Sequence, residues 1–75
     1  MREISEGMGL AIRKARTRLE MTQTELANRV GVSKNCVWLW EHGYRSPDAG
    51  RLWRLANALA LNVSELTAYK IIEQK

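Results

Sequence analysis

Two short amphipathic segments on either side of Gly31 constrain the fold of this chain more than any other feature. Apolar residues recur at helical spacing in residues 23–30 and again in residues 34–42. Glycine is the residue that best tolerates the left-handed backbone at a helix end. Thr22 and Glu25 form the sequence pattern of a capping box at the start of the first segment. The sequence therefore predicts two short helices joined by a tight turn.

The spacing within these two segments is that of a helix-turn-helix. Counted from Gln23, the fifth position is Ala27, where the helices touch and only a small side chain fits, and the ninth is Gly31, in the turn. The fourth, eighth, fifteenth and eighteenth positions are predicted core residues: Leu26, Val30, Val37 and Trp40. An ordinary helical hairpin without a role in DNA binding is the alternative.

Helical patterns also precede and follow this pair. The first covers residues 7–20, with a predicted buried stripe of Met8, Ile12, Ala15 and Leu19. Asp48 can cap another helix that extends to about residue 60, with a stripe of Leu52, Leu55, Ala56 and Leu59. Asn62 or Ser64 can cap a fifth segment that contains Val63, Leu66 and Ala68. We find no alternating strand pattern and therefore expect an all-α fold.

Trp38 and Trp40 cannot both enter the same core. Residues two apart on a helix point about 200° away from each other. Trp40 lies within about 60° of Val37 and is predicted to be core, whereas Trp38 falls on the outer side of the same helix. We expect Trp38 to serve a surface function, with packing over Lys34 or against a partner subunit as the alternative.

Composition limits the classes of function. The 75 residues suffice for a single domain, and a net charge of +4 with a pI of about 9.7 is a modest indication of a nucleic-acid partner. One Cys and one His give no disulfide framework, metal site or catalytic group, so we expect neither an enzyme nor a cofactor. The chain has no apolar run long enough for a membrane span and no signal-peptide pattern, so we expect a cytoplasmic protein.

The segments MTQTELANRVGVSKNCVWLWEHGYRSP and LWRLANALALNVSEL resemble the Cro and phage-repressor type of helix-turn-helix family, the XRE family. The resemblance covers about residues 8–68 and leaves a short tail, 69–75. It implies a compact five-helix lambda-repressor-like domain whose third helix lies in the DNA major groove. Two features depart from the family: Ala60 stands where a glycine is frequent, and Trp38 and Leu39 replace the usual polar residues. The matching residues are Arg16, Thr22, Gln23, Leu26, Ala27, Gly31, Val32, Ser33, Val37, Glu41 and Gly43.

The candidate DNA-binding residues fall into two groups. Asn35 can bond adenine, and Lys34 can bond guanine. Leu39 can touch a thymine methyl or exclude water, and Trp38 can pack on a sugar edge or a thymine methyl, so these four are predicted to read bases. A second group at the helix ends is predicted to contact phosphates. It consists of Thr22, Gln23, Ser33, His42, Tyr44 and Arg45. The resemblance further implies that Arg16 and Glu41 form a partly buried ion pair between the first and third helices.

Together these features predict a repressor-like transcriptional regulator that binds double-stranded DNA sequence-specifically. The resemblance implies a homodimer on a two-fold operator, and Trp53 with Tyr69, Ile71 and Ile72 of the tail are candidates for the dimer contact. For Trp53, packing under the fifth helix is the alternative. The rival function is a protein-interaction module, such as an antitoxin or an adaptor, and the outward-facing Trp38 and Leu39 favour it because aromatic anchors are frequent at protein interfaces.

Overall fold

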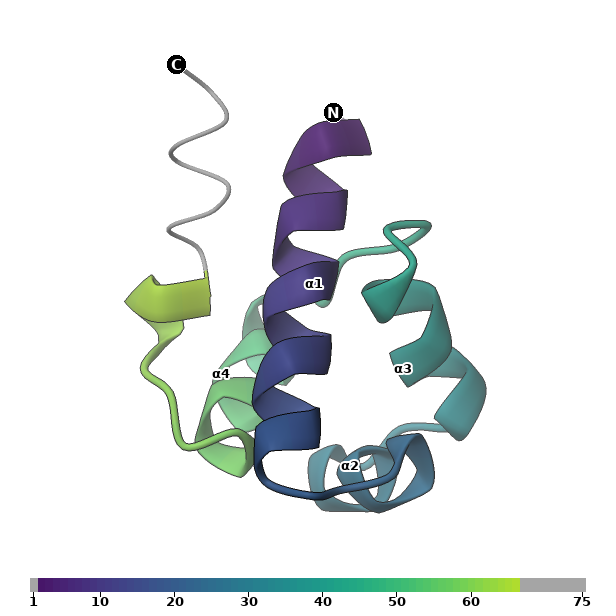
Figure 1. The fold of residues 1–75 in the computed structure, drawn as a ribbon, viewed down its shortest axis with the longest axis vertical. Coiled ribbons are helices and arrows are strands. Elements are labelled where there is room, and N and C mark those ends of the chain that lie inside the picture. The colour runs from purple at the N-terminus through teal and green to yellow at the C-terminus, as the bar shows by residue number, and fades with distance from the viewer. Residues whose placement is uncertain (1, 67–75) are drawn as a thin grey trace.

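The computed structural model describes residues 2–66, and the side chains of residues 7–66. This part of the chain contains helices and no strand, as predicted (Figure 1). A fifth helical segment covers residues 63–66. Helix α1 packs on α3, and α2 packs on both α3 and α4. The four helices described in full are α1 (Arg2–Arg18), α2 (Gln23–Val30), α3 (Lys34–Glu41) and α4 (Ala49–Ala58).

The two central helices form as predicted because their ends are capped locally. The Thr22 hydroxyl accepts from the Glu25 N–H at 3.0 Å, and the Thr22 N–H donates to the Glu25 carboxylate at 2.7 Å, which is the reciprocal capping box. Gly31 ends α2 in the left-handed conformation, with φ 87°. The hydroxyl of Ser33 then caps α3 by accepting from the Cys36 N–H at 3.2 Å. These contacts fix where α2 begins and ends and where α3 begins.

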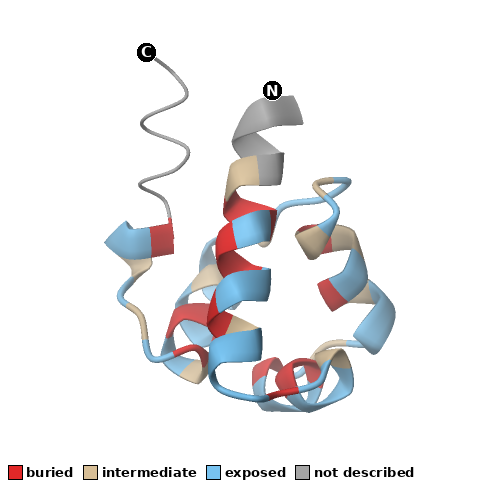
Figure 2. Ribbon diagram, in the orientation of Figure 1, coloured by how far each residue is buried: buried red, intermediate tan, exposed pale blue. Residues whose placement is uncertain are grey.

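The core lies between the helices, where the buried positions of each one face inward (Figure 2). Trp40 is among them, whereas Trp38 is 39% exposed, so the predicted division of the two tryptophans is confirmed. Leu52 is only half-buried at the edge of the core. The buried residues are Met8, Ala11, Ile12, Ala15, Met21, Leu26, Ala27, Val30, Val37, Trp40, Leu55, Ala56, Leu59 and Leu66.

The first helix differs from the prediction at both ends. It begins at Arg2 instead of residue 7 and stops at Arg18 instead of residue 20. Glu20 adopts a left-handed conformation with φ 58°, and the next residue returns its N–H to the Arg16 carbonyl at 3.1 Å. Leu19, predicted as core, is therefore 42% exposed, and Met21 enters the core in its place.

Helix α4 ends at Ala58, two residues before the predicted end, because Ala60 turns left-handed with φ 59°. The Leu61 N–H donates to the Ala56 carbonyl at 2.9 Å, which closes the helix end in the way that a glycine usually does. An alanine in this conformation costs about 1 kcal/mol relative to glycine. Asn62 starts the next helical segment, with its N–H donating to the Glu65 carboxylate at 2.8 Å.

Gly9 lies where the backbone of α1 packs closely against the end of α3. A Cβ atom at Gly9 would lie 2.5 Å from the carbonyl oxygen of Glu41 and 2.6 Å from that of Trp40. Both neighbours are backbone atoms, so they cannot rotate away. The absence of a side chain at Gly9 therefore allows α1 to pack closely against the carboxyl end of α3.

Candidate nucleic-acid interface

Helix α3 is held to the rest of the molecule along one face. Val37 and Trp40 are buried on that face. At its end, the Glu41 carboxylate receives the Arg16 guanidinium from α1 through two hydrogen bonds, of 2.6 and 3.1 Å. The side-chain amide of Gln23, from α2, donates to the same carboxylate at 3.1 Å. The pair implied by the family resemblance thus joins three helices, and the Glu41 side chain is only 1% exposed.

The opposite face of α3 is open and carries a shallow hollow. It has a volume of about 320 Å³ and is lined by Lys34, Asn35 and Trp38. Three of the four predicted base-reading residues are therefore brought together on one surface. Leu39, the fourth, is half-buried and does not line this hollow.

An aromatic cluster continues this face beyond the end of α3. The Trp38 ring stacks on His42 at a centroid distance of 4.0 Å and on Tyr44 at 5.7 Å, with interplanar angles of 23° and 19°. Nδ1 of His42 lies 2.9 Å from the Trp38 carbonyl oxygen, which fixes the imidazole ring. Tyr44 is 70% exposed. Two predicted phosphate-contacting residues therefore adjoin the predicted base-reading surface.

The start of α2 is less free to bind phosphate than the sequence indicated. The Thr22 N–H and hydroxyl are both used by the capping box, and the Gln23 amide points to Glu41. The N–H groups of Gln23 and Thr24 remain, because the first residues of a helix have no carbonyl four residues earlier within it. Ser33 is exposed and its hydroxyl hydrogen can still be donated to a phosphate. Phosphate binding at α2 would therefore rest on backbone groups.

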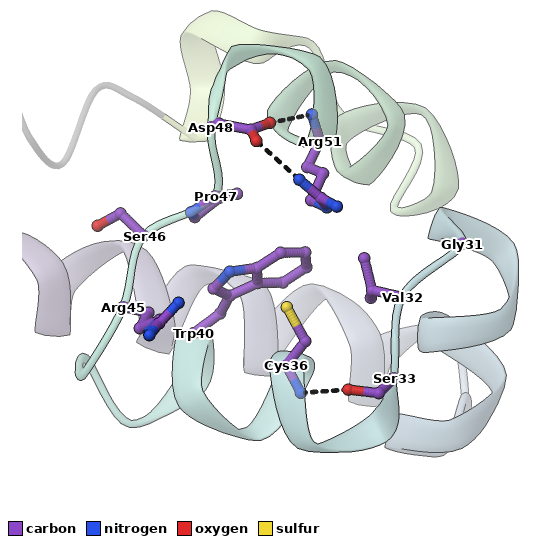
Figure 3. A pocket seen from close by; sticks show the side chains of 10 residues that line it. All are labelled: Gly31, Val32, Ser33, Cys36, Trp40, Arg45, Ser46, Pro47, Asp48 and Arg51. Atoms are coloured by element: carbon purple, nitrogen blue, oxygen red, sulfur yellow. Dashed lines mark hydrogen bonds and ion pairs between the residues drawn. The ribbon is translucent and has the colours of Figure 1, made fainter.

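Arg45 lies on a different hollow, between α3, the turn after α2 and the start of α4 (Figure 3). This second hollow measures about 390 Å³. The sulfur of Cys36, a free and half-buried cysteine, points into it beside the Trp40 ring. Arg45 is itself exposed, and it lines this hollow instead of the one beside Lys34, Asn35 and Trp38.

Two exposed carboxylates near the helix starts are held in the charged form. The backbone N–H of Thr22 lowers the pKa of Glu25, and the Thr22 hydroxyl contact adds to the effect. The backbone N–H of Arg51 lowers the pKa of Asp48, which also pairs with the Arg51 guanidinium at 2.7 Å. Both helices therefore already hold a negative charge at their amino ends.

The structure assigns roles to two residues that sequence reasoning placed elsewhere or missed. Gln23 bonds a carboxylate that is 18 residues away, which no local pattern could indicate. Gly9 carried one available signal, since a glycine inside a helix is unfavourable and usually has a packing reason.

Residues 7–66 contain no group of three or more potential metal ligands, and no helix described here is long and apolar enough to span a membrane. The structure does not describe residues 67–75. The dimer contacts predicted for Tyr69, Ile71 and Ile72 therefore lie outside the described residues, as does Ala68 of the predicted fifth segment.

The fold and the open face of α3 define a helix-turn-helix protein. The family model described as "Helix-turn-helix" matches residues 12–66. The chain belongs to this helix-turn-helix family, of the Cro and phage-repressor type, whose members are DNA-binding transcriptional regulators and not enzymes.

The chain is also similar to individual proteins that are already known. The P22 c2 repressor, solved in complex with a synthetic operator, is 34% identical, with a TM-score of 0.77 over 79% of this chain and 89% of the repressor chain. The clp gene regulator ClgR of Corynebacterium glutamicum shares the fold, with a TM-score of 0.83 at 24% identity over 93% of this chain and 74% of that one. An uncharacterized transcriptional regulator in the ATPase CF(0) region of Rhodospirillum rubrum is 38% identical over 56 residues, or 75% of this chain. The chain spans about half, 52%, of the length of that curated relative.

Proposed function

We propose that this chain is a repressor-like transcriptional regulator that binds double-stranded DNA sequence-specifically, with α3 in the major groove. The observation that carries the proposal is the division of α3 into two faces. Val37, Trp40 and Glu41 fix one face to the domain, and Lys34 and Asn35 stand exposed on the other. The similarity to the P22 c2 repressor, whose structure contains an operator, supports this function. A cytoplasmic location, a single domain with a core over residues 8–68 and the tail 69–75 belong to the same proposal.

We further propose that the protein acts as a homodimer on a two-fold operator. Two copies of α3 would then enter successive major grooves on one side of the DNA, about 34–36 Å apart. Trp53 on α4 is a candidate for the dimer contact because its side chain is 61% exposed instead of packed under the next helical segment. Sedimentation of the Trp53→Ala variant beside the parent protein tests this contact. Equal dimerisation of both would remove Trp53 from the interface.

Selection of binding sites from random double-stranded DNA tests the main proposal. We expect an enriched sequence with two inverted half-sites whose centres are about 10–10.5 base pairs apart. Because phosphate contacts release counterions, affinity for that sequence should fall as salt rises. Failure to enrich any sequence at low salt, by protein that melts cooperatively, would contradict the proposal.

An alternative function is supported by the aromatic cluster on the outer face of α3. Trp38 and Tyr44 are exposed aromatic side chains, and such residues are frequent anchors in protein interfaces. In this case the chain would be an interaction module, such as an antitoxin or an adaptor. The Trp38→Ala variant separates the two functions, since it would weaken operator binding in the first case and only capture of a protein from lysate in the second.

A further inference from the structure

The hollow on the outer face of α3 has one apolar wall and two polar groups. Trp38 supplies the wall, and Lys34 and Asn35 supply an ammonium and an amide beside it. Its volume of about 320 Å³ is roughly ten times the ~30 Å³ share of a water molecule in the liquid, so it has room for the edge of a nucleobase.

The apolar wall is held in place before any ligand binds. Stacking at 4.0 Å on His42 and at 5.7 Å on Tyr44 restricts rotation of the Trp38 ring, and the contact between Nδ1 of His42 and the Trp38 carbonyl holds the imidazole in turn. A side chain that is already ordered loses little conformational freedom on binding. The wall therefore favours a ligand group of matching shape and polarity.

The base edges of the major groove offer only one apolar group, the 5-methyl of thymine. Adenine N7 and guanine N7 and O6 are acceptors, and they would lose a water partner against the carbon atoms of the indole. Asn35 lies beside the wall and can bond adenine N6 and N7 through its amide.

From this arrangement, and on the basis of the DNA-binding function proposed above, we infer that Trp38 receives the 5-methyl group of a thymine. The adjacent amide of Asn35 reads an adenine, so each half-site contains an A·T-specific step at the position of the hollow. Lys34 stands at the same hollow and contacts a neighbouring phosphate or guanine. His42 and Tyr44 are positioning residues that hold the indole.

Replacement of thymine by uracil tests this inference, because it removes only the 5-methyl group. On the selected operator, replacement of one thymine in a single half-site should lower affinity about fourfold, because the burial of about one methyl group is lost. Replacement in both half-sites should give about fifteenfold, if the two contacts are independent. 5-Bromouracil at the same position should restore affinity, because its bromine fills the space of the methyl group.

Trp38→Ala supplies the decisive comparison, with Asn57→Ala on the exposed side of α4 as the control. The uracil effect at that position should disappear in Trp38→Ala and persist in Asn57→Ala. An operator on which no uracil replacement matters, or on which the effect survives in Trp38→Ala, overturns the inference while the DNA-binding function stands. A Trp38-dependent loss caused by 7-deazaguanine instead would assign the hollow to guanine. If the selection yields no operator at all, the proposed function itself has failed.

Discussion

Replacement of Gly9 by alanine should destabilise the protein, against the intrinsic preference of a helix. Alanine is favoured over glycine inside a helix by up to about 1 kcal/mol. At Gly9 the added Cβ would lie 2.5 and 2.6 Å from the carbonyl oxygens of Glu41 and Trp40. Overpacking of this kind costs about 1–3 kcal/mol, and the upper end applies here because backbone atoms cannot rotate away. The net loss should therefore be about 2 kcal/mol.

Gly50 in α4 provides the matched control. A Cβ there would meet only the carboxylate oxygen of Asp48, at an ordinary distance of 3.8 Å. Gly50→Ala should raise stability by about 0.4–1 kcal/mol through the reduced freedom of the unfolded chain. For a domain of this size, about 4–8 °C per kcal/mol separates the two outcomes in a melting curve followed by circular dichroism. If Gly9→Ala raises the melting temperature as Gly50→Ala does, α1 does not approach α3 this closely.

Three further results follow from the core, the ion pair and the capping box. Trp40→Ala should remove about 3–5 kcal/mol, which leaves little of the roughly 5 kcal/mol expected for a small domain, so its melting transition should be lost or fall sharply. Arg16→Ala leaves the buried Glu41 carboxylate without its cation and should cost about 3–5 kcal/mol in the same assay. The Thr22 N–H lowers the pKa of Glu25 below its ordinary 4.5, so that contribution to stability is present above pH 4.5 and is lost as the pH falls through the lowered folded pKa. Glu25→Gln should therefore show a smaller drop in melting temperature between pH 6 and pH 3 than the parent protein.

Exposed counterparts of these residues serve as controls. Trp38→Ala should melt within a few degrees of the parent protein, because surface substitutions usually change stability by about 0.5 kcal/mol or less. Arg51→Ala breaks an ion pair that is exposed, so its melting temperature should hardly change. A Trp38→Ala protein that melts as low as Trp40→Ala would mean that the face of α3 is wrongly assigned, and an Arg16→Ala protein as stable as Arg51→Ala would show that Glu41 is not dependent on its partner.

The features that could be predicted from sequence depend on residues close together in the chain. The capping box of Thr22 and Glu25 and the left-handed turn at Gly31 involve contacts within four residues. The faces of Trp38 and Trp40 follow from helical periodicity alone. These local signals also agree with one another, so the helix-turn-helix and its core follow from the sequence.

The features that could not be predicted depend on tertiary contacts or on unusual backbone. The end of α1 is set by Glu20 in a left-handed conformation, and a glutamate gives no sequence signal for such a turn. Helical periodicity therefore predicts Leu19 as a core residue, whereas in the structure Met21 is buried and Leu19 is exposed. Gln23 resembles a phosphate-binding residue by position, yet its amide donates to Glu41 across 18 residues.

The aromatic cluster belongs to the same group of unpredicted features. Helical spacing places His42 one turn after Trp38, but the contact with Tyr44 depends on how the chain turns after α3. The Tyr44 N–H returns to the Leu39 carbonyl at 3.0 Å and Gly43 adopts φ 78°, which brings the tyrosine back over the outer face. The order of the indole could therefore be recognised only in the folded chain.

Titration of Asn35→Ala with two DNAs shows whether the outer face of α3 reads DNA sequence. One DNA carries the selected operator and the other carries the same bases in scrambled order, and Asn57→Ala on the exposed side of α4 is the control. We expect Asn35→Ala to lower the preference for the operator by about 1–3 kcal/mol per half-site contact, and Asn57→Ala to keep it. An unchanged preference in Asn35→Ala, or an equal loss of affinity for both DNAs, would contradict the claim that this face reads sequence.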